Sequence, residues 1–209
     1  MSKVCVLASG GVDSAMLLAE RLDRGDEVFP LYVRCGFRWE RAELLWLRRL
    51  LGALSGRGRL RALTVAEAPE RPLLASRHWG LDGRGVPPAQ SPWESVYLPG
   101  RNLILLSEAG VFCAARGIDR IDQAILKGNQ FKDATPRFRR AMEAALREGL
   151  GARIRIEAPY ANLTKEQALR RASGVPLEKT FSCLSPKGFR HCGRCSKCEE
   201  RDLVLERPR

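Results

Sequence analysis

Apolar runs bounded by glycine and proline alternate along the chain with segments whose apolar residues recur at helical spacing. The apolar runs predict β-strands over residues 3–8, 28–33, 60–65, 121–126 and 154–158. The helical spacing predicts α-helices over residues 13–23, 38–54, 102–116, 136–148 and 164–171. Such alternation is typical of a doubly wound α/β fold, in which helices cover both faces of a parallel sheet.

Two segments depart from this alternation. Residues 68–97 are rich in Pro, Gly, Arg and Ser, and a connection of this length is typical of a functional loop or a mobile lid. Residues 176–209 predict a cysteine-rich loop with a charged tail. The pattern therefore predicts an α/β domain over residues 1–175 and a small C-terminal region over residues 176–209.

Composition narrows the class of protein. The 209 residues include 36 Lys and Arg against 24 Asp and Glu, which gives a net charge of +12. With 44% apolar and 29% charged residues the chain is expected to fold, and it lacks an apolar run long enough to span a membrane. The basic excess fits anionic small substrates or a nucleic-acid partner, and composition does not decide between them.

The first candidate site is the string S-G-G-V-D-S at residues 9–14, between the first predicted strand and helix. Two glycines let the backbone take positive φ and let a ligand approach closely. The helix that follows directs unpaired N–H groups and the positive end of its dipole at that ligand, which suits an oligophosphate. Asp13 lies where it can cap the helix or sit near a phosphate-bound Mg²⁺. The string matches neither the Walker loop nor the dinucleotide fingerprint.

The second candidate site is a cluster of four cysteines spaced C-x8-C-x2-C-x2-C, formed by Cys183, Cys192, Cys195 and Cys198. Four thiolates at this spacing predict a closed, structural zinc site. The alternative is an iron–sulfur or redox-active cluster, and His191 is expected to lie outside the ligand set. The other cysteines, Cys5, Cys35 and Cys113, are expected to be buried. Clustered thiols and the lack of a secretion signal favour a cytoplasmic protein.

The S-G-G-V-D-S string resembles the PP-loop of the ATP pyrophosphatases, Rossmann-like proteins of the adenine nucleotide alpha hydrolase type, which adenylate a carbonyl-type oxygen. Three further segments resemble one branch of them, the QueC (ExsB) family. Tyr97–Asn102 matches its Y-V-P-G-R-N string, Leu177–Cys183 its T-W-S-C segment with Phe181 for Trp, and Cys192–Cys198 its C-G-x-C-x-x-C end. The resemblance covers most of the chain, in order.

The resemblance implies an enzyme that converts 7-carboxy-7-deazaguanine, ammonia and ATP into 7-cyano-7-deazaguanine for queuosine biosynthesis, with Mg²⁺ and a structural Zn²⁺. It implies these ATP contacts: Ala8, Ser9, Gly10, Gly11, Val12, Asp13 and Ser14. It implies catalytic roles for Asp13, Ser14, Arg101 and Lys165, and substrate contacts from Asn129, Phe131 and Asp133. The residues themselves leave alternatives open.

Four of these positions also fit ordinary structural roles. Arg101 suits an anion site or an exposed position at a loop, and Asn102 suits a helix N-cap or a polar substrate contact. Asp133 suits a contact to the edge of a base or a cap before Pro136, and Lys165 suits a phosphate contact or a solvated first turn.

Two segments differ from the family pattern. Residues 34–40 read R-C-G-F-R-W-E where the family has D-Y-G-Q-R-H, and only three residues separate Asn129 from Asp133. Both lie where the acid is expected to bind, so 7-carboxy-7-deazaguanine is expected to be a poor substrate or to be replaced by another acid. The alternatives are a PP-loop enzyme that modifies tRNA and a zinc-ribbon module without catalysis. A homodimer stays open, and a nucleic-acid partner is not favoured.

Overall fold

The computed structural model describes all residues except 1, 69–77, 173 and 206–209. The strands are β1 Lys3–Leu7, β2 Glu27–Arg34, β3 Arg59–Leu60, β4 Thr64–Glu67, β5 Arg120–Asp122 and β6 Arg155–Glu157. The α-helices are α1 Val12–Asp23, α2 Glu40–Leu54, α3 Trp79–Asp82, α4 Arg101–Ala114, α5 Pro136–Leu150, α6 Lys165–Arg171 and α7 Ser196–Leu205. Single 3₁₀ turns occur at Trp93–Val96, Lys132–Ala134 and Leu177–Lys179.

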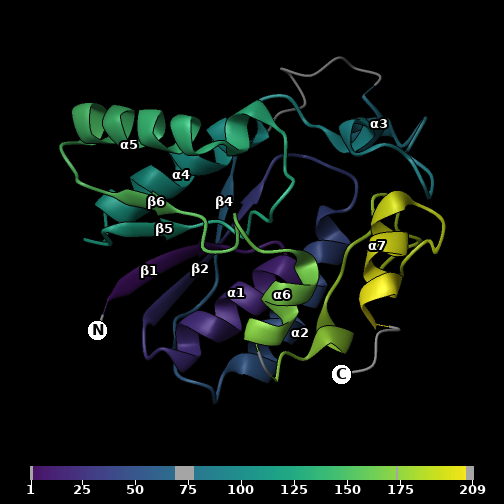
Figure 1. The fold of residues 1–209 in the computed structure, drawn as a ribbon, viewed down its shortest axis with the longest axis horizontal. Helices are drawn as coiled ribbons and strands as arrows, with labels where there is room; N and C mark the ends of the chain where they lie inside the picture. The colour runs from purple at the N-terminus through teal and green to yellow at the C-terminus, as the bar shows by residue number, and fades with distance from the viewer. Residues whose placement is uncertain (1, 69–77, 173, 206–209) are drawn as a thin grey trace.

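The strands form one parallel sheet in the order β3-β2-β1-β5-β6, with β4 also paired to β2 (Figure 1). This confirms the predicted Rossmann-like α/β fold. Chain order reverses between β1 and β5, which are neighbours in the sheet. In such sheets the ligand crevice lies beyond the carboxyl ends of the strands at that reversal. The loops after β1 and β5 therefore border the expected crevice.

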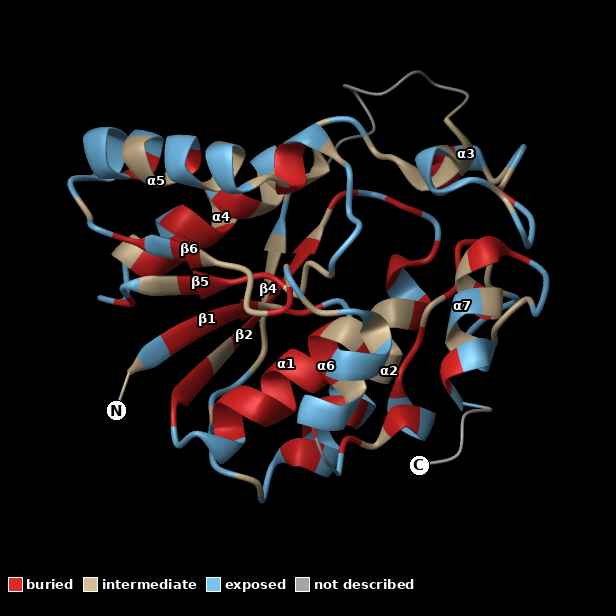
Figure 2. Ribbon diagram, in the orientation of Figure 1, coloured by how far each residue is buried: buried red, intermediate tan, exposed pale blue. Residues whose placement is uncertain are grey.

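Helices cover both faces of the sheet. One face carries α4 and α5, and the other carries α1, α2 and α6 (Figure 1). Strand β1 serves both layers because successive side chains point to opposite faces. Val4 and Val6 pack in the core with α1, whereas Cys5 packs in the core with α4, and all three are fully buried. Most of β1 is buried accordingly (Figure 2). As predicted, Cys35 and Cys113 are buried too.

The prediction of a single strand at residues 60–65 is wrong. The chain forms two short strands there, and both pair with β2. Val28 pairs with Leu60, and Leu31 pairs with Thr64. The stretch from Leu60 to Thr64 is therefore one residue longer than the stretch of β2 from Val28 to Leu31 that it faces. An extra residue interrupts the hydrogen-bond ladder as a bulge does.

The prediction of a loop and tail from residue 176 onward is also wrong at its end, because residues 196–205 form helix α7. The run S-K-C-E-E-R-D-L-V-L mixes good helix formers (Lys, Glu, Arg, Leu) with weaker ones (Ser, Cys, Asp, Val), so local propensity did not decide its structure. The described part of the predicted 68–97 loop contains α3 and a 3₁₀ turn, and residues 69–77 lie outside the described residues. Among the described residues, no helix is long and apolar enough to cross a membrane.

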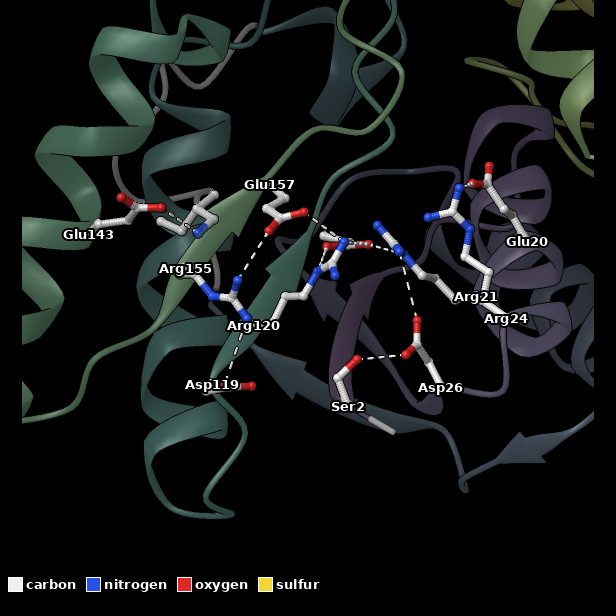
Figure 3. A network of polar contacts seen from close by, with 12 residues as sticks. Ser2, Glu20, Arg21, Arg24, Asp26, Asp119, Arg120, Glu143, Arg155 and Glu157 are labelled. Carbon is white, nitrogen blue, oxygen red and sulfur yellow. Dashed lines mark hydrogen bonds and ion pairs between the residues drawn. The ribbon is translucent and has the colours of Figure 1, made fainter.

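A buried ion-pair network joins α1 to the strands β5 and β6 (Figure 3). The Asp122 carboxylate is fully buried and accepts a hydrogen bond of 2.6 Å from Arg21 Nε and one of 2.7 Å from Arg120 Nε. Arg120 also pairs with Glu157 at 2.7 Å, and Arg21 lies 3.7 Å from Asp26. A buried carboxylate needs such partners because an unpaired charge in the interior is strongly destabilising. The network fixes α1 against β5, whose loop borders the crevice.

Candidate nucleotide, acid and metal sites

The turn between β1 and α1 forms a nest of backbone N–H groups. Gly10 has φ +80°, a conformation that favours glycine, and Gly11 is the extended N-cap of α1. Ser14 Oγ accepts a hydrogen bond from Gly10 N at 3.2 Å and donates one to Gly11 O at 3.1 Å, while Ser9 Oγ accepts from Gly11 N at 3.2 Å. Gly11 has no side chain to cap the helix, so the first N–H groups of α1 are left for a ligand.

The same turn is held between α2 and the C-terminal region. A Cβ on Gly10 would lie 3.2 Å from the Leu47 Cβ, and a Cβ on Gly11 would lie 3.3 Å from Ser182 Oγ. Phe181 N donates a hydrogen bond of 2.8 Å to Gly10 O. Gly10 is therefore favoured by both backbone shape and close packing, whereas Gly11 has an extended backbone and is favoured by packing alone. The hydrogen bond from Phe181 joins the cysteine-rich region directly to this turn.

Asp13 and Lys165 form an ion pair at the mouth of this turn, with 2.8 Å between Lys165 Nζ and Asp13 Oδ1. Asp13 lies in the first turn of α1. Lys165 is the first residue of α6, which the predicted capping box opens: Thr164 accepts from Gln167 N, and Gln167 accepts from Thr164 N. The pair brings a carboxylate, which suits Mg²⁺, and an ammonium, which suits phosphate, together beside the N–H nest.

Two adjoining cavities open beside the turn. The larger has a volume of about 410 Å³ and the smaller about 280 Å³. Both are lined by Ser9, Asp13, Ser14, Val96, Leu98, Arg101 and Lys197. Of the other predicted site residues, Ala8, Asn129, Phe131 and Asp133 line the larger cavity, and Gly11, Val12 and Lys165 line the smaller one. Gly10 lines neither cavity, because its carbonyl faces Phe181.

Asp133 connects the larger cavity to the start of α4. Its Oδ2 atom accepts a hydrogen bond of 3.0 Å from Asn102 N, so this carboxylate caps α4 and not the helix that follows it. Helix α5 is capped instead by Thr135, whose side chain accepts from Phe138 N. Asn102 is not the N-cap of α4, since Gly100 occupies that position, and Asn102 Oδ1 accepts from Gln123 Nε2 at 3.1 Å.

Phe131 and Tyr97 line the larger cavity and belong to an aromatic cluster that also includes Trp93. The Phe131 ring lies 5.0 Å from the Trp93 ring and 4.9 Å from the Tyr97 ring, measured between centroids. Asn129 Oδ1 accepts a hydrogen bond from Phe131 N at 3.0 Å and thereby shapes the loop that carries the ring. The three residues between Asn129 and Asp133 thus suffice to place an aromatic ring against the cavity.

Segment 34–40, which departs from the family pattern, builds an aromatic stack beside the smaller cavity. The Phe37 and Trp39 rings are parallel at 4.8 Å, and Trp39 stacks on Trp79 at 5.6 Å. Trp39 and Trp79 line the cavity, and the Arg101 guanidinium lies 5.0 Å from the Phe37 centroid. Arg101 thus contacts this stack through Phe37 and lines both cavities.

Several lining residues were not anticipated. They are Glu43, Trp79, Gln123, Ser182, Lys197 and Glu200. No motif includes Glu43, Trp79 or Gln123, although Gln123 immediately follows a strand whose carboxyl end was expected to meet the crevice. Ser182 and Lys197 lie within the Leu177–Cys183 and Cys192–Cys198 motifs, so these motifs and the position of Gln123 are the signals that the sequence offered.

Replacing Glu43 with glutamine is expected to change how stability depends on pH. Burial raises the pKa of Glu43 from its ordinary 4.5 to about 7, against a hydrogen bond from Tyr32 and the charge of Arg101, with Glu40 raising it further. The folded protein keeps this proton up to pH about 7 and the unfolded chain releases it near 4.5. Wild-type stability therefore falls as pH rises through this window, by up to about 3 kcal/mol at 1.36 kcal/mol per pKa unit.

The measurement is urea unfolding of the wild type and Glu43→Gln at pH 5 and pH 8. Relative to the wild type, the variant is expected to gain stability at the higher pH, since glutamine has no proton to lose. Glu148→Gln, at an exposed position on α5, is the matched control and should show no such gain. A stability difference between wild type and Glu43→Gln that is the same at both pH values would contradict the prediction.

The four cysteines converge as predicted, and their Sγ atoms all lie within 4.8 Å of one another. The Sγ atoms of Cys195 and Cys198 are 3.5 Å apart, and those of Cys192 and Cys198 are 3.9 Å apart. A tetrahedral zinc with Zn–S bonds of about 2.3 Å places neighbouring sulfurs about 3.8 Å apart, so the spacing fits. Leu184 N donates to Cys195 Sγ and Cys192 N to Cys183 Sγ, and such hydrogen bonds stabilise thiolates.

His191 lies outside this set of ligands. Its Nε2 accepts a hydrogen bond from Ser182 N at 3.3 Å, and its ring packs against the Phe181 ring at 4.4 Å between centroids. The histidine thus supports the segment that contacts Gly10.

Comparison with known proteins decides the family. The model of the family described as "Queuosine biosynthesis protein QueC" matches residues 3–207. The chain belongs to the QueC family. A 7-cyano-7-deazaguanine synthase 1 from Desulfitobacterium hafniense (strain Y51) is 33% identical, with 98% of this chain and 92% of that protein covered. A 7-cyano-7-deazaguanine synthase from Methanopyrus kandleri is 29% identical, with 99% and 95% covered.

A solved structure supports the fold. A 4-thiouridine synthetase, determined in complex with RNA and bound ATP, matches with a TM-score of 0.54 at 16% identity, over 98% of this chain and 50% of that chain. At this identity the likeness concerns the fold alone. Membership of the QueC family rests on the sequence matches across nearly the whole chain.

Proposed function

We propose that this chain is an ATP-dependent ligase that forms 7-cyano-7-deazaguanine from 7-carboxy-7-deazaguanine and ammonia. The observation that carries the proposal is the N–H nest at Gly10–Ser14, which borders two adjoining cavities in a QueC-family chain. One cavity offers polar groups for a heterocyclic acid and the other offers charged groups for phosphates. The family's relatives are named for this product.

The phosphate-binding groups serve the first half of the reaction. The N–H groups at the start of α1 and the Ser9 and Ser14 hydroxyls bind the β- and γ-phosphates of ATP, which leave as pyrophosphate. Lys165 neutralises charge on the departing group, and Asp13 is the residue that would hold Mg²⁺, which supplies further neutralisation of that charge. Arg101, which lines both cavities, binds the α-phosphate or the carboxylate that attacks it.

Adenylation solves the chemical problem of the acid. A carboxylate is a poor electrophile, so its oxygen first attacks the α-phosphorus of ATP, which forms an acyl adenylate and releases pyrophosphate. Ammonia then adds to the carbonyl carbon and AMP leaves, which gives the amide. Adenylation of the amide oxygen by a second ATP and loss of the remaining N–H protons then expels AMP and yields the nitrile. The phosphate-binding residues serve both adenylations.

The thiolates of Cys183, Cys192, Cys195 and Cys198 would hold Zn²⁺ in a structural role. No sulfur of the set is needed as a nucleophile in the steps above. Because Phe181 and Ser182 precede the first ligand and contact Gly10 and His191, the metal would stiffen the wall behind the phosphate-binding turn. Free thiolates persist in a reducing compartment, which agrees with a cytoplasmic enzyme.

The test is to incubate the purified protein with ATP, Mg²⁺, ammonium and 7-carboxy-7-deazaguanine, and to measure AMP, pyrophosphate and nitrile. All three products are expected, and omission of ammonium should abolish the nitrile. Segment 34–40 differs from the family pattern where the acid is expected to bind, so the identity of the acid needs its own test. Related heterocyclic acids are therefore assayed in parallel. If AMP were released with another acid but not with 7-carboxy-7-deazaguanine, that acid would be the substrate. If AMP release required tRNA, the proposed function would be wrong.

A further inference from the structure

Gln123 is a buried polar residue that lines the larger cavity and lies outside every motif of the chain. It follows the last residue of β5, and its N–H continues the sheet by donating to Glu157 O at 2.9 Å. The side chain is 4% exposed, and its Nε2 donates to Asn102 Oδ1 at 3.1 Å. Its Oε1 atom is buried and has no hydrogen-bond partner among the described residues. The backbone thus fixes an amide whose oxygen is unsatisfied.

Asp133 presents the same feature at the same cavity. The residue is 7% exposed, and while Oδ2 accepts from Asn102 N, the buried Oδ1 has no hydrogen-bond partner in the described part of the chain. Asn102 therefore stands between the two side chains, with its backbone bonded to Asp133 and its side chain bonded to Gln123. A buried acceptor without a partner destabilises the folded protein, and a ligand with matching donors removes that penalty.

Gln123 Oε1 and Asp133 Oδ1 are two unsatisfied acceptors on either side of Asn102, so a matching ligand must present two neighbouring hydrogen-bond donors. A 2-amino-4-oxopyrimidine ring, as in a guanine or deazaguanine, offers a ring N–H and an exocyclic amino group along one edge. Adenine offers an amino group beside a ring nitrogen acceptor, and that lone pair would oppose a carboxylate or amide oxygen. A hydrogen bond to a carboxylate is charge-assisted and hence stronger than one to a neutral oxygen.

We propose that Gln123 is a specificity-determining residue that, with Asp133, binds the two-donor edge of a guanine-like acid through Oε1 and Oδ1. This inference deepens the proposed function and rests on it for the identity of the acid. In this pose the ring edge of the acid lies beside Asn102. Phe131 provides an aromatic wall of the same cavity. ATP occupies the part of the site formed by the phosphate-binding turn.

The direct test is calorimetric titration of 7-carboxy-7-deazaguanine into protein saturated with magnesium and a non-hydrolysable ATP analogue. Gln123→Met keeps the length of the side chain and removes the acceptor, so the Kd for the acid is expected to rise about tenfold, as one lost hydrogen bond predicts. Gln130→Met is the matched control, because Gln130 is exposed in the neighbouring loop and lines neither cavity. Its Kd should equal that of the wild type.

A second ligand separates recognition from a structural effect. The analogue without the 2-amino group is expected to bind the wild type about tenfold more weakly than the parent acid, and this discrimination should shrink in Gln123→Met. A purely structural role would weaken both acids equally and overturn the proposal. The wild-type comparison needs no variant, so equal affinity for the two acids would overturn it even if Gln123→Met failed to fold.

Kinetics distinguish this inference from the proposed function. The KM for ATP is expected to be unchanged in Gln123→Met while the KM for the acid rises. A raised KM for ATP with an unchanged KM for the acid would assign Gln123 to the nucleotide base and overturn the proposal. If the enzyme formed the nitrile but Gln123→Met left the KM for the acid unchanged, the inferred role of Gln123 would be wrong and the proposed function would stand. Acid binding that depends on Gln123 without any nitrile formation would remove the proposed function alone.

Discussion

Asp13→Asn is expected to lower kcat for AMP and pyrophosphate release on the order of 10²–10³-fold, the typical loss when one group that stabilises a developing charge is removed. The substitution preserves the shape of the side chain but removes the charge that pairs with Lys165 at 2.8 Å and that would hold Mg²⁺. Asparagine can still occupy the first turn of α1, so the fold should persist. Initial rates and a thermal unfolding curve measure the two effects separately.

The control is Asp119→Asn, which makes the same change at an exposed residue paired with Arg155 on the surface. It is expected to leave kcat unchanged. Magnesium should lower the Kd for ATP in the wild type and much less in Asp13→Asn. Wild-type turnover in Asp13→Asn would remove the β1–α1 turn from the proposed mechanism.

Cys195→Ser is expected to abolish stoichiometric zinc and to lower the free energy of unfolding by on the order of 5 kcal/mol, the scale of the loss of a structural metal. Cys195 Sγ is buried, accepts from Leu184 N and lies 3.5 Å from Cys198 Sγ, so serine removes a ligand from the centre of the cluster. Metal content of the purified protein and denaturant unfolding are the measurements. The wild type should contain about one zinc per chain.

Cys113→Ser is the matched control, since this thiol is equally buried but lies outside the cluster. It should retain the zinc even if the buried hydroxyl lowers stability. Weakened ATP binding in Cys195→Ser is also expected, because the Phe181–Gly10 hydrogen bond joins the metal region to the phosphate-binding turn. Full zinc content in Cys195→Ser, or an iron–sulfur absorption spectrum in the wild type, would contradict the assignment.

Local patterns were the predictable part of the site. The turn at Gly10–Ser14, the capping box before Lys165 and the cysteine spacing each depend on residues close together in the chain, and the structure has all three. Their geometry follows from backbone conformation and short-range hydrogen bonds, so a single sequence suffices. The division into two domains at residue 175 stays a prediction, as do the catalytic roles of individual residues.

Contacts between distant residues were not predictable in the same way. The sequence left open whether Asp133 caps the helix that follows it; instead it caps α4, 31 residues earlier in the chain, and it also lines the larger cavity. Gln123 bonds Asn102 across 21 residues, and Arg21 bonds Asp122 across 101 residues. Helix α7 and the split of β3 from β4 were missed for a related reason, since packing and pairing partners decided them.

The sequence alone determined the parallel α/β sheet, the glycine-rich turn between β1 and α1 and the cluster of four cysteines, because hydrophobic periodicity and residue spacing act over a few residues. The tertiary structure decided which polar groups face the cavity with unsatisfied oxygens, namely those of Gln123 and Asp133. Whether a buried oxygen has a partner depends on the position of every neighbouring atom, and strands and helices far apart in the chain supply those neighbours.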